Sequence, residues 1–220
     1  MTLYEAVFAR HSVRRFTDRE IEPEKAEILQ KKIDEINGKT GLNFSLCLNE
    51  PEAFMANKPS YGSFAGCRNY FVLAAAKGRD EDIGYYGEEL VLLSQTLGLN
   101  TCWVALTFEK NKVPVKLADG EKICDVIALG YGQTQGVPHK SKPVDKLCKI
   151  KGEAPDWFMK GMEAAALAPT AINQQRFIIS CDDGRVSAKA LFGPCSKTDL
   201  GIVKYHFELG AGKDNFIWEE

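Results

Sequence analysis

The sequence Ala168-Pro169-Thr170-Ala171-Ile172-Asn173-Gln174-Gln175-Arg176-Phe177 marks the point where a helix gives way to a strand. Pro169 fixes its own φ and disfavours the helical conformation at Ala168, so a helix expected over residues 156–167 must end there. An apolar run over residues 177–181 then predicts a strand. The small residues and side-chain amides between them suit a flat heteroaromatic ligand, and an ordinary helix-to-strand turn is the alternative.

The composition bounds the class of protein. The chain has 220 residues, 45% of them hydrophobic, and a net charge of −2. This length allows one substantial domain or two small ones, and the charge balance argues against a disordered chain, a nucleic-acid binder or a membrane-surface protein. The seven cysteines form no C-x-x-C pair, so we expect reduced thiols and no disulfide framework or metal site. The N-terminus lacks a signal-peptide pattern, and we expect a cytoplasmic protein.

Capping and periodicity predict the other elements. Thr2 and Glu5 have the spacing of a capping box, which opens a helix through about Ala9. A second helix begins near Pro23 and ends at Asn37-Gly38, with its apolar face inward. We expect strands over residues 44–48, 69–76, 101–107 and 123–129, a helix over 82–97, a loop over 49–63 and a linker over 136–151.

Part of the chain resembles another part. Asp82-Ile83-Gly84 returns 117 positions later as Asp199-Leu200-Gly201, and each triplet is expected near the start of a helix. A strand is expected before each helix, and a strand carrying Trp103 or Trp218 is expected after it. Chance similarity of this kind is common, so the repeat is a hypothesis. It predicts two similar halves related by a pseudo-twofold axis.

A basic cluster follows the first helix. Residues 10–16 carry three arginines around Ser12, and guanidinium groups bind phosphate through paired hydrogen bonds. Lys140 and Lys142 could complete a cationic cage around one phosphate. A solvated basic strip is the alternative. The glycine motifs of Rossmann and P-loop nucleotide sites do not occur.

Four segments together resemble the FMN-dependent nitroreductase family. They are Arg10-His11-Ser12-Val13-Arg14-Arg15-Phe16 (family pattern R-R/H-S-x-R/K-x-F), the A-P-T-A-I-N-Q-Q of residues 168–175 (A-P-S-x-x-N-x-Q), the G-L-N-T-C-W-V-A of residues 98–105 (G-L-G-T-C-W-I-G), and Leu129-Gly130-Tyr131-Gly132 followed by Lys140-Ser141-Lys142-Pro143. Thr170 replaces the usual serine and keeps its hydroxyl. Ala105-Leu106 replaces a common glycine pair.

The order of these segments is unusual for the family, because the A-P-S-like loop follows the closing element. This order resembles a Thermotoga-type subgroup in which one chain carries two nitroreductase-like halves. The resemblance implies an α+β, nitroreductase-like fold with a central, mostly antiparallel sheet flanked by helices and duplicated internally as a pseudo-dimer. Residues 1–150 would form the half with the phosphate-binding arginines, and residues 151–220 the half that supplies the flavin loop. The chain would bind one FMN as a monomer.

The resemblance also implies a set of FMN contacts. The residues are Arg10, His11, Ser12, Arg14, Ser63, Val104, Ala105, Leu106, Lys140, Lys142, Pro169, Thr170, Ala171, Asn173 and Gln175. The first arginine, Ser12 and the two lysines would hold the phosphate, and Arg14 would lie near the pyrimidine edge of the flavin. Residues 104–106 would offer backbone groups near N5, and Ser63 is included for its place before a strand. No side chain is required as a catalytic acid or base, because the flavin carries the hydride chemistry.

The resemblance implies an FMN-dependent oxidoreductase that takes hydride from NADH or NADPH. It would then reduce a small acceptor, such as a nitroaromatic compound or a quinone, in a ping-pong cycle. One alternative is the family's flavin-fragmenting dimethylbenzimidazole synthase branch, which a lid and an oxygen pocket would distinguish. Another is a non-catalytic flavin-binding module, which would bind FMN without reduction by NAD(P)H.

Overall fold

The computed structural model describes residues 1–55 and 63–219. The chain divides into two compact units: unit 1 comprises Met1–Ala9, Asp80–Glu89 and His139–Glu220, and unit 2 comprises Arg10–Arg79 and Leu90–Pro138. The sequence predicts two nitroreductase-like halves, residues 1–150 and 151–220. The division into compact units does not test whether these halves are related to each other. The units do not follow that boundary, because the N-terminal helix and the start of helix α3 (Asp80–Thr96) join the C-terminal part.

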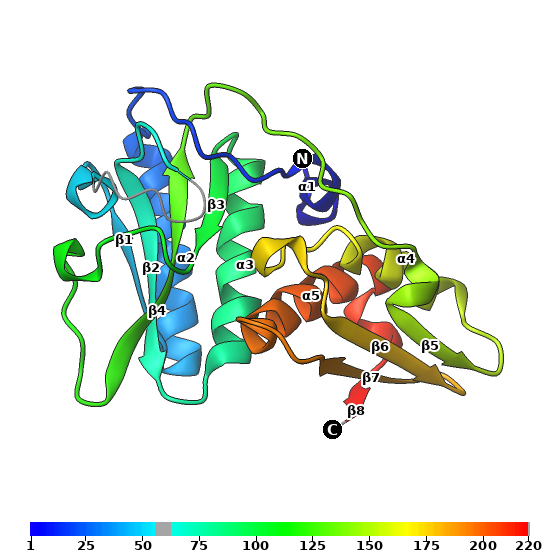
Figure 1. Ribbon diagram of the computed structural model, residues 1–220. Coiled ribbons are helices and arrows are strands. Elements are labelled where there is room, and N and C mark those ends of the chain that lie inside the picture. The colour runs from blue at the N-terminus through cyan, green and yellow to red at the C-terminus, as the bar shows by residue number, and fades with distance from the viewer. Residues whose placement is uncertain (56–62, 220) are drawn as a thin grey trace. The chain divides into compact units, whose positions relative to one another are not determined.

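Unit 2 is built on an antiparallel sheet with the strand order β1-β2-β4-β3 (Figure 1). Its strands are β1 (Asn43–Cys47), β2 (Asn69–Ala76), β3 (Asn100–Val104) and β4 (Glu121–Gly130). The apolar run of β2 is buried on both faces, as its unbroken hydrophobicity predicts. The predicted strand over residues 101–107 was too long, since β3 ends at Val104 and Leu106 is 84% exposed.

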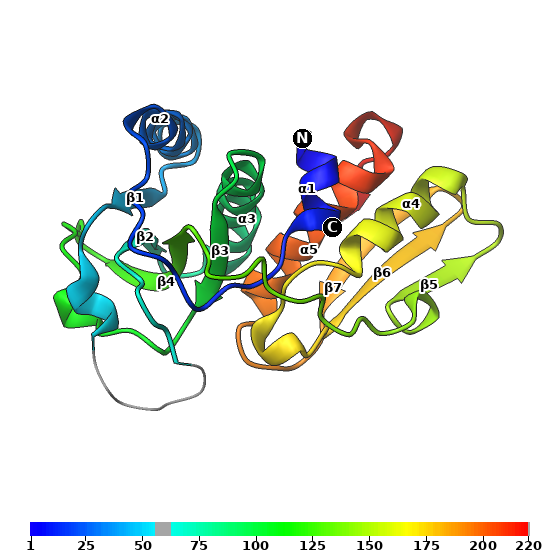
Figure 2. The same ribbon diagram turned by 90° about the horizontal axis from the view of Figure 1, so that it is seen from above.

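Helix α2 (Pro23–Thr40) packs on β1 (Figure 2). Its buried residues are Leu29, Ile33 and Ile36, as the helical period predicts. The predicted end at Asn37-Gly38 was wrong. The helix runs on to Gly41, whose φ of 69° is left-handed and whose N–H donates to the carbonyl of Asn37.

Unit 1 contains the second sheet, with the strand order β5-β6-β7-β8. Its strands are β5 (Cys148–Lys151), β6 (Phe177–Asp182), β7 (Arg185–Ala190) and β8 (Trp218–Glu219). Helix α5 (Ser196–Ala211) packs on β6 and β7, and α4 (Asp156–Ala165) and α1 (Leu3–Ala9) pack on α5 (Figure 2). The protein therefore has an α+β fold with antiparallel sheet, although the strands form two sheets and the pairs β5–β6 and β7–β8 are parallel.

The capping box at the start of α1 is confirmed. The N–H of Thr2 donates to Oε2 of Glu5 at 2.8 Å, and the N–H of Glu5 donates to Oγ1 of Thr2 at 3.1 Å. Short 3₁₀ turns complete the described chain: η1 (Pro51–Phe54), η2 (Lys110–Lys112), η3 (Val144–Lys146), η4 (Ala171–Asn173) and η5 (Lys213–Asn215). The predicted loop over residues 49–63 contains η1, and residues 56–62 lie outside the described part of the chain.

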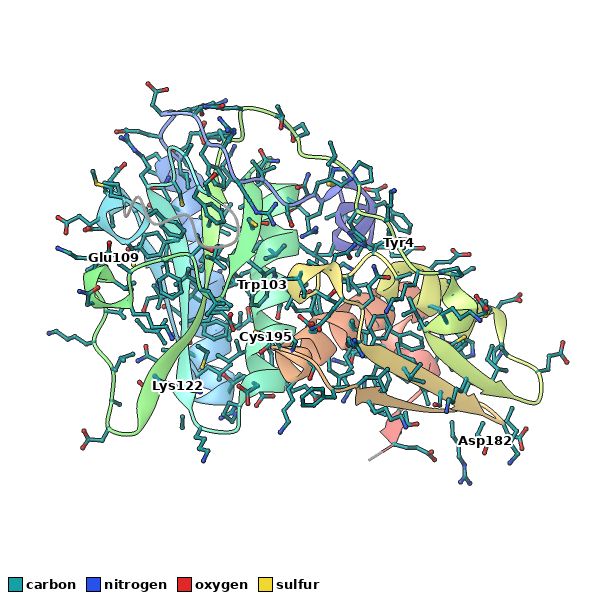
Figure 3. The ribbon with its side chains drawn as sticks, in the orientation of Figure 1. Tyr4, Trp103, Glu109, Lys122, Asp182 and Cys195 are labelled. Carbon is teal, nitrogen blue, oxygen red and sulfur yellow. The ribbon has the colours of Figure 1, made fainter. Side chains whose placement is uncertain are left out.

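Two strands of unit 1 were not predicted. β5 closes the segment that the sequence suggested was a linker, and its alternation of lysines with less polar residues lacks the apolar run of a buried strand. β7 follows a tight hairpin at Asp182-Asp183-Gly184, where Asp183 and Gly184 have φ values of 48° and 82°, as in a type I′ turn. Asp182, labelled in Figure 3, accepts a hydrogen bond from Lys151 of β5 at 3.1 Å.

The two Asp-x-Gly triplets meet within unit 1. A Cβ on Gly84 would lie 1.9 Å from the carbonyl oxygen of Thr198, and a Cβ on Gly201 would lie 1.9 Å from that of Glu81. Each oxygen belongs to the residue three positions before the opposite glycine, so the contact is reciprocal, as at a twofold axis. Only glycine permits this approach.

The strands do not share this symmetry. β3 runs parallel to β2, because both are antiparallel to β4. In unit 1, β8 runs antiparallel to β6, because β8 is parallel to β7 while β6 is antiparallel to it. The helix crossing therefore supports a local twofold relation, and duplication of the whole chain stays a hypothesis.

Candidate functional site

Residues 10–16, the arginine segment, form an extended stretch of unit 2. Its backbone is held by β3 and by the loop before β2: the N–H of Val13 donates to the carbonyl of Thr101 at 3.0 Å, and the N–H of Phe16 donates to that of Ala65 at 2.9 Å. Val13 and Phe16 are also buried in the hydrophobic core of unit 2. The position of the segment is therefore set by residues that are distant in sequence.

Two glycines make room for the arginine segment. A Cβ on Gly66 would lie 2.4 Å from the carbonyl oxygen of Phe16, and a Cβ on Gly136 would lie 2.8 Å from the Cβ of His11. Both glycines have positive φ, 69° and 75°, which costs an L-residue free energy. The backbone around the segment is thus closely packed.

Arg10 is the buried cation of this segment. Arg10 is only 5% exposed, and its Nε and Nη1 atoms have no hydrogen-bond partner among the described residues. A buried guanidinium with unpaired N–H groups is unfavourable, because its lost hydration is not replaced. An anion with several acceptor oxygens would satisfy these groups, so this feature fits the phosphate of FMN.

Ser12 and Arg14 lie near the buried thiol of Cys102. The Ser12 side chain hydrogen-bonds the thiol, and Arg14 and Arg10 act on it electrostatically. Burial nevertheless raises the pKa of Cys102 above its usual value, against the lowering effect of the two guanidinium groups. The thiol therefore stays protonated at neutral pH and is unsuited to act as a nucleophile.

The remaining candidates of unit 2 differ in exposure. Val104 is buried at the end of β3, Ala105 is half-buried, and Leu106 is exposed. His11 is half-buried in the arginine segment, and Ser63 is exposed before β2. Within unit 2, the structure thus connects the arginine segment to β3, the strand that ends at Val104.

Residues 168–176 form the amide loop of unit 1. Ile172, Asn173 and Gln175 have φ values of 48°, 54° and 45°, a left-handed conformation that is unfavourable for residues other than glycine. The loop is held in part by its own groups: the N–H of Asn173 donates to the carbonyl of Thr170 at 2.9 Å, and the N–H of Gln175 donates to Oγ1 of Thr170 at 3.0 Å. The Thr170 hydroxyl therefore supports the loop from within.

Gln175 joins the amide loop to the crossing segment that contains Lys140 and Lys142. Its Oε1 accepts the N–H of Lys142 at 2.7 Å, and its Nε2 donates to the carbonyl of Lys140 and to Oδ1 of Asn173, both at 2.9 Å. The residue is 2% exposed. Both N–H groups of the side-chain amide are used inside the protein, so Gln175 supports the loop.

The lysines are also tied to this loop. The ammonium of Lys142 donates to the carbonyls of Gln174 and Gln175 at 2.8 and 3.1 Å, and the carbonyl of Lys140 accepts Nδ2 of Asn173 at 3.0 Å. The structure therefore brings the predicted lysines together with Asn173 and Gln175 in unit 1, while the predicted arginines belong to unit 2.

Asp199 is a polar residue of this loop's surroundings that the sequence did not mark as functional. It lies in the first turn of α5, soon after Cys195 (Figure 3), and is 3% exposed. Its Oδ1 accepts the N–H of Ala171 at 2.9 Å, and its Oδ2 accepts Nε2 of Gln174 at 2.8 Å. Burial raises the pKa of Asp199 to about 6, although these two hydrogen bonds lower it. The repeated Asp-x-Gly pattern was the one sequence signal that could have drawn attention to Asp199. Asp82, at the matching position of the other triplet, differs from Asp199 in being only half-buried.

A protein-family model described as "Putative TM nitroreductase" matches residues 2–211. The chain is 24% identical to a "putative nitroreductase" of known structure from Thermotoga maritima, with a TM-score of 0.67 over 97% of this chain and 85% of that one. A comparison with curated proteins found no match.

Other similar structures share the fold at lower identity. A "putative nitroreductase in complex with FMN" from Desulfovibrio desulfuricans is 16% identical, with a TM-score of 0.53 over 70% of this chain and 99% of that one. A "putative NADH dehydrogenase/NAD(P)H nitroreductase" from Bacteroides thetaiotaomicron is 19% identical, with a TM-score of 0.52 over 66% of this chain and 95% of that one. Within residues 1–55 and 63–219, no helix is long and apolar enough to cross a membrane.

Proposed function

Because the chain belongs to the nitroreductase family whose model covers residues 2–211, we propose that it is an FMN-dependent oxidoreductase. It takes hydride from NADH or NADPH and reduces a small acceptor, such as a nitroaromatic compound or a quinone, in a ping-pong cycle. Family membership supports the oxidoreductase class. The FMN complex of the Desulfovibrio protein, which has a similar fold, supports the choice of cofactor.

The observation that carries this proposal is the buried guanidinium of Arg10, whose Nε and Nη1 have no hydrogen-bond partner in the described part of the chain. Such a group is stabilised by a ligand that is both anionic and rich in acceptor oxygens, and a terminal phosphate is both. Arg10 and Ser12 would bind the FMN phosphate, with Lys140 and Lys142 as further cationic contacts. His11 would contact the ribityl chain through its backbone.

The amide loop would contribute Pro169, Thr170, Ala171 and Asn173 to the ring and the ribityl chain. Gln175 would act by holding that loop, since its amide is already engaged. Backbone groups of residues 104–106 would lie along the N5 edge, and Ser63 remains a proposed contact.

When bound, FMN would supply the hydride and electron-transfer chemistry. The chain's own contribution is binding and electrostatics. Arg14 would place a positive charge near the pyrimidine edge, where negative charge develops on reduction, and would thereby favour the reduced state. No side chain has to hold or move a proton in this scheme.

The deciding experiment is a visible absorption spectrum of the purified protein after loading with FMN, followed by anaerobic titration with NADH and NADPH. We expect a bound-flavin spectrum that bleaches on addition of the nicotinamide. A protein that cannot be loaded with FMN would reject the proposal. Bound flavin that does not bleach would indicate a binding module, and flavin consumed in the presence of dioxygen would indicate the synthase branch.

We also propose that one chain binds one FMN as a monomer in the cytoplasm. Sedimentation of the FMN-loaded protein, together with the flavin content per chain, tests the stoichiometry. Loss of flavin on dilution in parallel with dissociation of an oligomer would contradict it.

A further inference from the structure

Asp199 is a buried carboxylate for which the proposed chemistry has no use. It receives two hydrogen bonds from the amide loop, one from the backbone of Ala171 and one from the side chain of Gln174. Its own backbone N–H donates to the carbonyl of Cys195 at 2.9 Å, within the first turn of α5. A rigid helix therefore presents this carboxylate to the loop.

The amide loop needs such an anchor. Ile172, Asn173 and Gln175 are held at positive φ, and residues in this conformation persist only where surrounding contacts enforce it. Ala171 and Gln174 lie on either side of Ile172 and Asn173. The two bonds to Asp199 therefore fix both ends of the left-handed pair.

The contact calls for a carboxylate in particular. The Nε2 of Gln174 donates to the carbonyl of Pro194 at 2.6 Å as well as to Asp199 at 2.8 Å, so both of its N–H groups have acceptors. A Cβ on Gly193 would lie 2.4 Å from Oε1 of Gln174, which shows how closely the other end of the amide is packed. With the amide fixed in this orientation, the partner must offer an acceptor to Gln174 and a second to Ala171.

We propose that Asp199 is a positioning residue that holds the amide loop in its FMN-binding conformation through Ala171 and Gln174. The inference rests on the proposed FMN function, because it assigns the loop to flavin binding. It extends that function to a residue of α5 outside the nitroreductase-like motifs.

The first test measures FMN affinity by quenching of flavin fluorescence on binding. Asp199→Ala is expected to raise the dissociation constant at least tenfold. Asp199→Asn, which keeps the shape but presents an NH₂ group to Gln174, is expected to raise it by a similar factor. Asp214→Asn is the matched control, since it removes an exposed carboxylate of the same unit, and it should leave the affinity unchanged. Full affinity in both Asp199 variants would overturn the proposal.

A double-mutant comparison tests whether Asp199 acts through Gln174. Gln174→Ala should weaken FMN binding, and adding it to Asp199→Ala should weaken binding by less than the product of the two separate effects. Strictly multiplicative effects would reject the coupling. The midpoint of thermal unfolding of Asp199→Asn separates positioning from a structural role: we expect an unchanged or raised midpoint alongside weaker binding. A lowered midpoint in step with the affinity would indicate a structural role only.

Amide hydrogen exchange of the FMN-free protein tests the anchor without the cofactor. In Asp199→Ala, residues 170–175 should exchange at least tenfold faster, while β6 and β7 keep the wild-type rate. Unchanged exchange in this loop would overturn the proposal. A wild-type chain that binds no FMN would instead reject the proposed function, and the exchange experiment would still decide whether Asp199 fixes the loop.

Discussion

The arginine segment and the amide loop differ in whether their polar side chains have hydrogen-bond partners within the protein. In the arginine segment, buried Arg10 keeps guanidinium nitrogens without a partner among the described residues. In the amide loop, the polar side chains of Gln174 and Gln175 are bonded within unit 1. The first arrangement leaves donors for the proposed ligand, whereas the hydrogen bonds of the second are made within the protein. Preorganised groups of the second kind reduce the ordering cost of binding.

The largest expected effect is the change in the free energy of unfolding with pH that Asp199 causes. The pKa of Asp199 is about 6 in the folded protein, against 3.8 as its ordinary value. Between these values the folded state holds a proton that the unfolded state has lost, so the free energy of unfolding falls as pH rises through this window. The loss from this group reaches at most about 3 kcal/mol by pH 7.

Denaturant unfolding of wild type and Asp199→Asn from pH 4 to pH 7 measures this difference directly. The asparagine variant should gain stability relative to wild type as pH rises, with Asp214→Asn following the wild type. If the difference in the free energy of unfolding between the two proteins stayed constant across this range, Asp199 would have an ordinary pKa. The difference between the amide loop and the arginine segment would then rest on their hydrogen bonds alone.

The next largest effect concerns Arg10, whose Nε and Nη1 lack a hydrogen-bond partner among the residues that the structure describes. Arg10→Ala should weaken FMN binding by about 2–3 kcal/mol, the worth of a lost charged hydrogen-bond pair. The FMN-free variant should be no less stable than wild type, because a buried unpaired charge is removed. Isothermal titration gives the affinity and thermal unfolding gives the stability. Arg15→Ala, an exposed residue of the same segment, is the matched control and should change neither.

Gln175→Ala tests the opposite region. It removes the buried side chain that accepts from the N–H of Lys142 and donates to the carbonyl of Lys140. The N–H of Lys142 loses this acceptor, while the carbonyl of Lys140 keeps the hydrogen bond from Asn173. We expect the free energy of unfolding to fall by about 2 kcal/mol, even without FMN. An effect seen only in the FMN-bound protein would mean that the loop is ordered by its ligand.

The smallest effect concerns redox tuning by the arginine segment. Arg14 is exposed, so its hydrogen bond to a reduced flavin would be worth only about 1.5 kcal/mol. Arg14→Ala should then lower the two-electron reduction potential by roughly 30 mV. Potentiometric titration against a reference dye measures this shift. An unchanged potential would remove Arg14 from the flavin's surroundings.

Local signals predicted much of the fold. The capping box of α1 and the buried stripe of α2 were predicted because they depend on residues within one or two helical turns. β2 was predicted with its observed bounds because its apolar run is continuous. The end of α2 was misjudged because Asn37-Gly38 looked like a helix stop, whereas the left-handed residue is Gly41.

The candidate site was likewise predicted only in part. The family motifs indicated the arginine segment and the amide loop without any knowledge of their contacts. The motifs did not indicate that the side-chain amide of Gln175 hydrogen-bonds the backbone of Lys140 and Lys142, or that Asp199 accepts a hydrogen bond from the loop. These partners are separated by more than two dozen residues, and no pattern of nearby side chains encodes such a pairing.

By itself, the sequence determined the helix with a capping box, the apolar strands and the four segments that resemble the family. Each follows from propensity, capping or periodicity over a few neighbouring residues. Only the tertiary structure decided that β5 pairs with β6, that Nε and Nη1 of buried Arg10 have no hydrogen-bond partner within residues 1–55 and 63–219, and that Asp199 accepts hydrogen bonds from the amide loop. Burial and long-range hydrogen bonds depend on which distant segments come into contact. Those contacts are determined by the free energy of the whole fold and not by neighbouring residues alone.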